Sequence, residues 1–385
     1  MLLKIKQKYR KVYSKAVHGL MLLKDKHINR HVVVFESDDW GSVRVPSLDT
    51  LRRLEKKQVS LALPQSYDSF DTLASNDDLE LLIDVLSSVK DVRGNPAIMT
   101  LNCCVANPDF ERIKDSDYSA YYYEPFTETL NRYPHHDRSF DLWRTGMRTQ
   151  VFRPQFHGRE HLNPQKWLRF LQGGNKAARA GFEEKCYAVV TYYRGRRDTF
   201  LEAFKIESEN EIAFVRQSIQ EGLELFERLF GFRSKSMIAP CFTWDSYIEE
   251  EAFKNGVLFI QGGYIQGHSD WQRSLGNHIT GHYLGEKNKL GQYYLVRNCS
   301  FEPSQKFSDS ADSCMASISK AFNNHLPAIV SCHRLNFIGT LNPANRDNNL
   351  REFKRLLQKI VTIYPDVVFM SSDKLGELYH SIDNE

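Results

Sequence analysis

Short apolar runs alternate with amphipathic stretches along most of the chain. Apolar runs predict strands at 31–37, 97–106, 151–158, 236–242, 257–263, 292–298, 327–333 and 366–372. Between them, apolar residues at helical spacing predict helices near 47–58, 77–89, 138–149, 163–172, 209–230, 246–255, 310–323 and 346–363. Two of these helices carry end signals, because Asn163 and Pro164 open one and Gly231 follows another. Strands that alternate with helices over this length predict a β/α-repeating fold, either a barrel or a doubly wound sheet.

The charge of the chain is uneven. Residues 1–30 carry nine Lys or Arg against Asp25 alone, a net charge of +8, and since the whole chain carries +3, the remainder carries −5. The apolar residues of this stretch recur roughly at helical spacing, so we predict a basic amphipathic segment at 1–27. It either docks on the main domain or makes peripheral membrane contact through residues 1–26. We expect one domain over 28–385, with insertions around 107–150 and 171–205.

Composition narrows the class of protein. With 41% hydrophobic and 26% charged residues the chain is typical of a folded globular protein, and its small net charge gives no argument for nucleic acid as a partner. Its seven cysteines include no CxxC pair, which indicates a reducing compartment. No secretory signal and no apolar run of transmembrane length stands out. We therefore expect a cytoplasmic location, with peripheral attachment at the inner membrane face as an alternative.

Polar and aromatic side chains follow several of the predicted strands. In α/β folds the carboxyl ends of parallel strands share one rim, and active sites form there. The residues expected on this rim are Asp38, Asp39, Trp40, Asn102, His157, His161, Cys241, Phe242, Trp244 and His333.

Two adjacent carboxylates at a strand end need a counter-charge, because like charges repel and buried carboxylates are rarely unpaired. "HGREH" places His157 and His161 four residues apart, so that in a helix or tight turn both imidazoles lie on one face. Two imidazoles and one carboxylate form a three-ligand set that leaves positions open for water and substrate. An HxxxH pair alone is a weak signal in a chain with 13 His.

Together, "ESDDWG", "HGREH" and "IVSCH" resemble three motifs of the polysaccharide deacetylases, carbohydrate esterase family four of the NodB-homology type. The resemblance covers about residues 31 to 375 in matching order. The segments "QFHGREHLN", "YLVRNCSFEPS" and "RLNFIGTLNPANRDNNL" are similar to a polysaccharide (de)acetylase-like branch. The resemblance implies a distorted (β/α) barrel, preceded here by the N-terminal amphipathic helix.

The resemblance also implies a role for each motif residue. Asp39, His157 and His161 would hold a divalent metal, Zn²⁺ before Co²⁺, Ni²⁺, Fe²⁺ or Mn²⁺. Asp38 would be the base that takes a proton from metal-bound water, and His333 the acid that protonates the leaving amine. The implied function is a metal-dependent N-deacetylase that hydrolyses the acetamide of an N-acetylated sugar in a polysaccharide, a glycoconjugate or its precursor.

The chain departs from the family pattern at the third motif, where an Arg normally precedes a Pro and orients the base. Here Ile238 and Ala239 precede Pro240. The arginines that could substitute are Arg44, Arg153, Arg233 and Arg297, and the sequence does not choose among them. For the fourth motif only Asp270–Trp271 is a partial candidate.

Substrate contacts are the least defined part of the expected site. Trp40 and Trp244 follow strand ends, where they either stack on sugar rings or pack in the core. The backbone N–H of Cys241 or Phe242 is an oxyanion donor by analogy with the family. Two other functions stay open: a catalytically silent carbohydrate-binding relative, and a metal hydrolase of another amide, ester or glycosidic bond.

Overall fold

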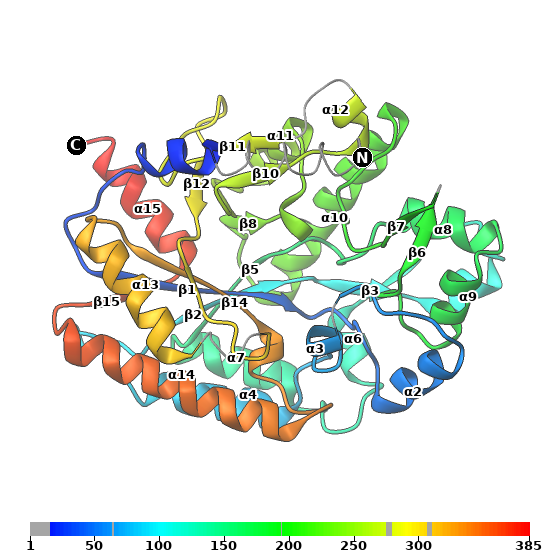
Figure 1. The fold of residues 1–385 in the computed structure, drawn as a ribbon, viewed down its shortest axis with the longest axis horizontal. Helices are drawn as coiled ribbons and strands as arrows, with labels where there is room; N and C mark the ends of the chain where they lie inside the picture. The colour runs from blue at the N-terminus through cyan, green and yellow to red at the C-terminus, as the bar shows by residue number, and fades with distance from the viewer. Residues whose placement is uncertain (1–15, 64, 194, 275–278, 306–309) are drawn as a thin grey trace.

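A nine-stranded sheet forms the centre of the molecule in this computed structural model, which describes residues 16–63, 65–193, 195–274, 279–305 and 310–385 (Figure 1). The strand order is β12–β9–β8–β5–β2–β1–β14–β13, and β15 also pairs with β1. All the neighbouring strands are parallel. The strands are β1 (Val32–Trp40), β2 (Met99–Cys103), β5 (Phe152–Phe156), β8 (Ser236–Ile238), β9 (Phe259–Gly262), β12 (Tyr293–Val296), β13 (Cys299–Ser300), β14 (Ala328–His333) and β15 (Val368–Met370).

The sheet curls until its two edges meet. β12 and β13 stand at opposite ends of the strand order, yet only Arg297 and Asn298 separate them in the chain. The Arg297 N–H donates to Gly262 on the β9 side (2.8 Å), and the Asn298 N–H donates to Ile329 on the β14 side (3.2 Å). One extended segment thus joins both edges, which confirms the expected distorted (β/α) barrel and excludes an open doubly wound sheet.

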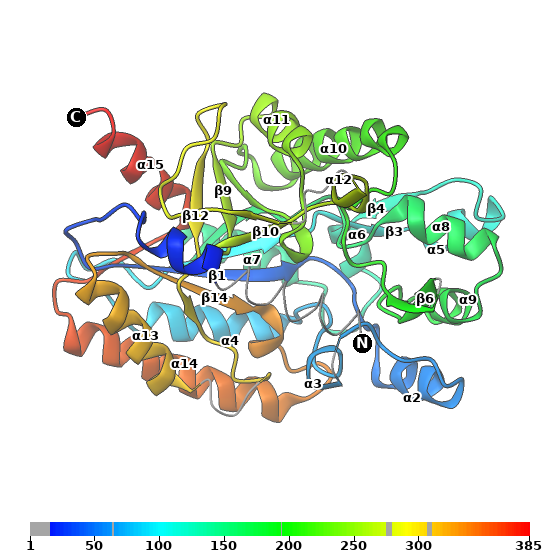
Figure 2. The same ribbon diagram turned by 45° about the horizontal axis from the view of Figure 1, so that its top comes forward.

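Helices cover the outside of the barrel, with α4, α13 and α14 on one side and α10 and α11 on another (Figures 1 and 2). The covering helices are α4 (Asn76–Ser87), α7 (Ser139–Arg148), α10 (Ile212–Phe230), α11 (Ser246–Lys254), α13 (Ala311–Asn323), α14 (Pro343–Ile363) and α15 (Ser372–Ile382). Two further helices, α2 (Leu48–Lys56) and α8 (Pro164–Gln172), pack in a region beside the barrel. The predicted end signals are confirmed: the Asn163 side chain caps α8 by accepting from the Lys166 N–H. Gly231 ends α10 in the left-handed conformation that glycine adopts without strain.

A second apolar cluster lies beside the barrel. It combines side chains from residues 45–62, from Ile113, from 162–201 and from Leu341, with Trp167 and Tyr187 buried at its centre. Short elements make up this region and the loops near the site: α3 (Gln65–Asp68), α5 (Phe110–Asp115), α6 (Phe126–Leu130), α9 (Lys176–Glu183), α12 (Asp270–Ser274), and the hairpins β3 (Ala106–Pro108)/β4 (Tyr123–Pro125), β6 (Thr191–Tyr193)/β7 (Arg196–Asp198) and β10 (Ile265–Gly267)/β11 (Ile279–Gly281). We keep the division at residue 27 and the two insertions as a proposal.

The predicted amphipathic segment at 1–27 can be compared with the structure only from residue 16 onward, because residues 1–15 lie outside the described residues. Residues 16–22 are helical and pack on the barrel through Met21. Within the described ranges, no helix is both long and apolar enough to cross a membrane. All seven cysteines are free thiols; six are buried, and Cys241 is exposed.

Candidate metal and catalytic site

A bulge at the end of β1 sets the directions of the two adjacent carboxylates. In a regular strand, neighbouring side chains point to opposite faces. Here the pairing of β1 with β2 shifts register between Ser37 and Trp40, and Asp39 adopts a positive φ of 73°. Aspartate tolerates this left-handed conformation better than most residues. The bulge lets both Asp38 and Asp39 reach the rim, while Trp40 turns into the core.

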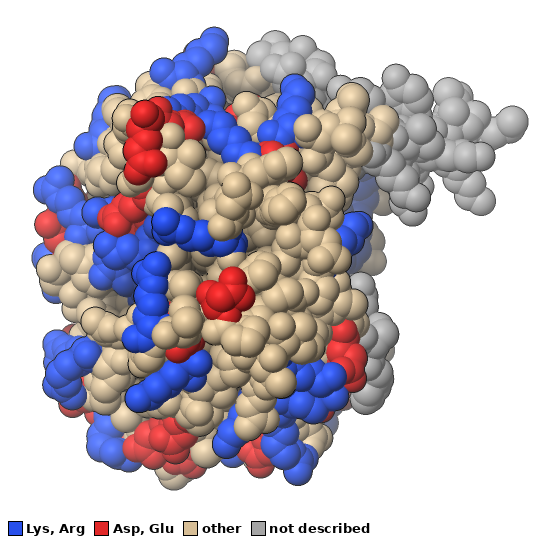
Figure 3. Space-filling model, turned by 90° about the vertical axis from the view of Figure 1, so that its left-hand side faces the viewer, with Lys and Arg blue, Asp and Glu red and all other residues tan. Residues whose placement is uncertain are grey.

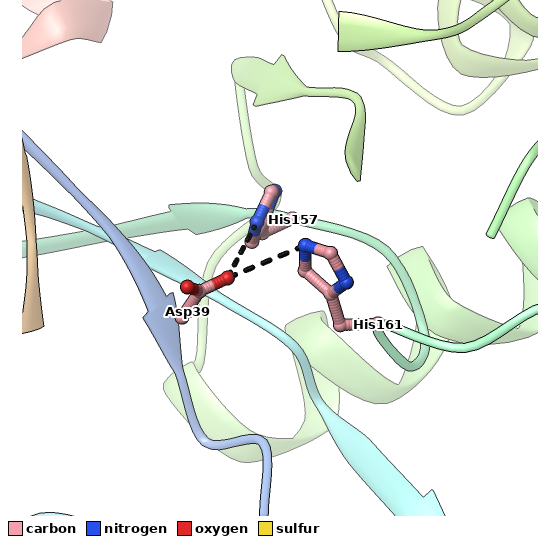
Figure 4. Close-up of side chains that lie close together, drawn as sticks. All are labelled: Asp39, His157 and His161. Atoms are coloured by element: carbon pink, nitrogen blue, oxygen red, sulfur yellow. Dashed lines mark ion pairs between the residues drawn. The ribbon is translucent and has the colours of Figure 1, made fainter. Parts of the chain in front are cut away.

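The structure brings Asp39, His157 and His161 together, as Figure 4 shows. The Asp39 Oδ1 atom lies 3.4 Å from His157 Nε2 and 3.3 Å from His161 Nε2. Their side chains are 2%, 3% and 5% exposed, respectively. Two ligands at about 2.0–2.1 Å from one tetrahedral ion would be about 3.3 Å apart, so this spacing fits a shared cation.

The imidazole of His157 is oriented for metal binding. Its Nδ1 lies 3.0 Å from the Ile238 carbonyl oxygen and donates to it, so Nε2 is the ring nitrogen that faces Asp39. Nε2 is buried and has no hydrogen-bond partner among the described residues. Burial lowers the pKa of His161 to about 3, which leaves that ring neutral. These donors suit a divalent cation of the zinc type.

Asp39 also belongs to a buried network of ion pairs and hydrogen bonds that the sequence did not predict. Arg44 Nη2 lies 3.1 Å from Asp39 Oδ1, and the Tyr67 hydroxyl donates to Asp39 Oδ2. Asp71 continues the network, with Oδ2 lying 3.1 Å from Arg44 Nε and Oδ1 accepting from Arg334 Nε at 2.7 Å. Burial alone would raise the pKa of Asp39, but the Arg44 guanidinium and the histidines hold it well below its usual value.

The second carboxylate, Asp38, is clamped by Arg297. The two Nη atoms each donate to one Asp38 oxygen at 2.7 Å, and the Asn102 side-chain N–H donates to Oδ1 at 2.8 Å. Arg297 Nε donates to Glu36 at 2.6 Å. Burial would raise the pKa of Asp38, but Arg297 outweighs it and the pKa is lowered. Arg297 is thus the candidate arginine that the structure brings to the expected base.

The other candidate arginines have different partners. Arg44 contacts Asp39. Arg153 pairs with Asp373 at 2.8 Å, and the exposed Arg233 pairs with Glu227. Arg297 reaches Asp38 because it lies at the junction of β12 and β13, where the barrel closes.

His333 ends β14, in register with Asp38 on β1. Its Nε2 lies 4.0 Å from Asp38 Oδ2, and its Nδ1 lies 2.5 Å from Glu302 Oε1. Asn336 donates to the other Glu302 oxygen at 2.8 Å. Burial would lower the pKa of His333, but the charge and hydrogen bond of Glu302 raise it to about 9. The His333 side chain is 27% exposed, so this side of the site faces solvent.

Two aromatic expectations are corrected. Trp40 and Trp244 are each 1% exposed, so neither indole face is open to a sugar ring. Trp40 packs edge-on against Trp143, and Trp244 stacks on His282. Of the two alternatives that the sequence left open, both indoles therefore take core packing, and neither is a substrate contact.

The loop after β8 also differs from the expectation. The predicted strand 236–242 ends at Ile238, because Cys241 and Phe242 adopt positive φ values of 56° and 51°. The Phe242 N–H donates to the Ala239 carbonyl (3.0 Å), so the Cys241 N–H is the better oxyanion-donor candidate of the two. The Phe242 ring lies 5.9 Å from the Arg297 guanidinium, beside the site.

Sequence reasoning missed Tyr67, Glu302 and Glu36. Glu302 lies two residues after the end of β13. It could have been found by looking for polar residues after the apolar run at 292–300, as was done for the other strands. Tyr67 lies on the short helix α3, for which no sequence signal was visible.

Comparisons with known proteins give structural likeness only. No family model and no curated protein sequence matches the chain. A 4-α-glucanotransferase from Thermococcus litoralis is 8% identical with a TM-score of 0.46; the match covers 91% of this chain, which spans only 40% of that protein. A probable polysaccharide deacetylase from Pseudomonas aeruginosa is 9% identical with a TM-score of 0.47, over 92% of each chain. A family 4 carbohydrate esterase from Streptomyces lividans is 10% identical with a TM-score of 0.36, over 91% of this chain and 96% of that one. Function must therefore be argued from the site itself.

Proposed function

We propose that this protein is a metal-dependent N-deacetylase that hydrolyses the acetamide of an N-acetylated sugar in a polysaccharide, a glycoconjugate or its precursor. The observation that carries the proposal is the division between two adjacent carboxylates. Asp39 faces two histidines, and Asp38 faces an arginine and a third histidine. This division supports a cation-binding role for Asp39 and a proton-accepting role for Asp38.

Asp39, His157 and His161 would hold the cation, with Zn²⁺ the best fit to the donor set and Co²⁺, Ni²⁺, Fe²⁺ or Mn²⁺ as alternatives. A divalent cation supplies Lewis acidity toward an amide carbonyl and toward water. The Cys241 N–H is a candidate donor to the oxyanion that forms on the carbonyl.

Asp38 would act as the general base. It stays ionised because Arg297 lowers its pKa, and a carboxylate offers about four acceptor positions, of which Arg297 and Asn102 use three. The remaining capacity is on Oδ2, the oxygen nearest His333. Arg297 would orient the carboxylate toward the attacking water, a positioning role that leaves one acceptor position for the proton.

His333 would act as the general acid. With a pKa of about 9 it is protonated at neutral pH, and Glu302 fixes the ring so that Nε2 carries the donatable proton. The leaving amine would take this proton as the C–N bond breaks.

The decisive experiment measures metal content by mass spectrometry and acetate release from N-acetylated oligosaccharides. We expect one metal equivalent in the parent protein, lost in Asp39→Asn and His157→Ala and kept in His380→Ala, which removes an exposed histidine of α15. Acetate release should vanish in Asp38→Asn and His333→Ala while metal stays bound. Acetate release that survives both substitutions would refute the assigned roles, and release from O-acetyl substrates alone would identify an esterase.

A second candidate is a silent carbohydrate-binding relative. The tight pairing of Asp38 with Arg297 favours it, because a strongly stabilised carboxylate is a weaker base. This candidate predicts that the protein binds glycans without releasing acetate, and that Asp38→Asn leaves the glycan affinity unchanged.

A further inference from the structure

A short apolar helix lies at the N-terminal boundary of the described chain. Residues 16–22 are helical, and residues 16–23 read AVHGLMLL, with His18 as the only polar side chain. Leu20, Leu22 and Leu23 are 58%, 43% and 84% exposed. Contiguous exposed apolar side chains of this kind mark a surface that contacts another apolar phase.

The helix is docked on the barrel by its opposite side. A Cβ placed on Gly281 of β11 would come within 2.4 Å of Val17 Cγ1 and 3.0 Å of Met21 Cγ, so both side chains lie directly over this glycine. His18 packs on Tyr264, with ring centroids 4.6 Å apart. The leucines therefore face outward from a helix whose inner side is already in contact with the barrel.

The chain just after the helix is anchored as well. Asp25 accepts from the Tyr264 hydroxyl (2.6 Å) and from the Leu284 N–H (2.8 Å). Asp25 is 6% exposed, so the only acidic residue of the first thirty presents almost no charge to solvent.

Charge indicates what the leucines contact. Residues 1–30 carry nine Lys or Arg, six of them within residues 1–15, and Lys24 is exposed directly after Leu23. On the face drawn in Figure 3, basic and acidic side chains of the described residues are interspersed. Basic excess thus accompanies the exposed leucines in sequence, and a polybasic stretch next to an apolar helix face is typical of binding to anionic lipids.

We propose that the N-terminal segment, residues 1–24, attaches the protein to an anionic lipid bilayer, with Leu20, Leu22 and Leu23 entering the interface and the lysines and arginines contacting lipid headgroups. Neither signal is strong alone, and stable attachment takes both. The inference does not depend on the deacetylase activity.

Co-sedimentation of the full chain with vesicles tests the proposal. Vesicles of phosphatidylcholine with 30% phosphatidylserine should bind the protein at 0.1 M salt, and pure phosphatidylcholine vesicles should bind it at least about tenfold more weakly. Binding should also fall at 0.5 M salt, because the Debye length shortens. The double variant Leu20→Ser/Leu23→Ser should lose at least about tenfold in partitioning, and a triple Lys→Gln variant at positions 4, 6 and 8 should lose a similar factor.

The matched control is Val92→Ser/Ile363→Ser, which removes exposed apolar side chains of 58% and 52% exposure outside the N-terminal segment. It should bind vesicles like the parent protein. The proposal would be overturned if the leucine variant bound vesicles as well as the parent protein. It would also be overturned if pure phosphatidylcholine vesicles bound the parent as strongly as vesicles with phosphatidylserine. A third outcome would also overturn the proposal: the parent does not bind vesicles but forms a concentration-dependent dimer in sedimentation velocity, and the leucine variant does not dimerise. In that case the leucines would contact a second copy of the chain.

Discussion

Replacing Arg297 by methionine tests whether this one side chain keeps two buried carboxylates in place. The side chain is 3% exposed and donates to both Asp38 and Glu36, whose side chains are 6% and 0% exposed. Removing one partner of a buried ion pair costs about 3–5 kcal/mol, because the remaining charge is buried without compensation. We expect Arg297→Met to lower the free energy of unfolding at pH 7 by at least that amount.

The pH dependence separates this mechanism from a simple packing defect. In the parent protein, the lowered pKa of Asp38 gives stability that is present above its unfolded pKa, near 4, and lost as the pH falls through the folded value. In the variant, burial without Arg297 would raise the pKa of Asp38 above its unfolded value. It would also raise the pKa of Glu36 further, which burial already raises in the parent protein. The folded variant then binds more protons than its unfolded chain, so its stability rises from pH 7 to pH 5 and the gap to the parent narrows.

Urea unfolding at pH 7 and pH 5 measures both effects. Arg233→Met is the control, because Arg233 and Glu227 are 67% and 46% exposed and such surface pairs contribute about 0–1 kcal/mol. Arg297→Lys should fall between parent and Arg297→Met, since an ammonium cannot make the three-way contact. A loss below about 1 kcal/mol at pH 7, or a gap that is the same at both pH values, would refute the reasoning.

Three further changes test the surroundings of the site. Glu302→Gln should bring the pKa of His333 down from about 9 toward its usual value, since the charge of Glu302 is what raises it; an NMR titration of the imidazole would read this out, and an unchanged pKa would contradict it. Tyr67→Phe removes the hydroxyl that donates to Asp39 Oδ2 and should weaken metal affinity about 10–100-fold by calorimetry, with little change in fold. Burial raises the pKa of Asp68 to about 7, so its ionisation lowers the free energy of unfolding as the pH rises from about 4 to 7. Asp68→Asn should remove this decline, a difference of up to about 4 kcal/mol at pH 8 in urea unfolding. Stability profiles of parent and variant that run parallel with pH would contradict this prediction.

Much of the fold follows from local signals. Asn163 and Gly231 mark helix ends because capping depends on side chains and conformations within a few residues. The meeting of Asp39 with His157 could be predicted for a different reason. β1, β2 and β5 are successive neighbours in a parallel sheet, so their carboxyl ends lie on one rim whatever the loops between them do.

The partners of the catalytic candidates follow from closure of the barrel, which no local pattern encodes. Arg297 and Asp38 are 259 positions apart, and they meet only because residues 293–300 bridge the two edges of the sheet. The sequence could not decide between core packing and sugar stacking for Trp40, because strand alternation cannot predict that Asp39 takes a left-handed conformation. Which arginine faces Asp38 is therefore decided by topology, and that arginine lies in the two-residue link between β12 and β13.

The same closure has a consequence for how the protein is made. A ribosome synthesises β1 before the other strands of the sheet. The strand that pairs with one of its edges, β14, and the strand that pairs with Val32–Val34 on the opposite edge, β15, are synthesised after all the others. Until Ala328–His333 has been synthesised, β1 has an uncovered edge able to pair with another chain, and residues 293–300 have only one of their two neighbours. A nascent or truncated chain that stops before β14 lacks the second edge that positions Arg297 opposite Asp38. Assembly of the site therefore waits until β14 has been synthesised, and we expect products that terminate before it to aggregate rather than accumulate as partly active fragments.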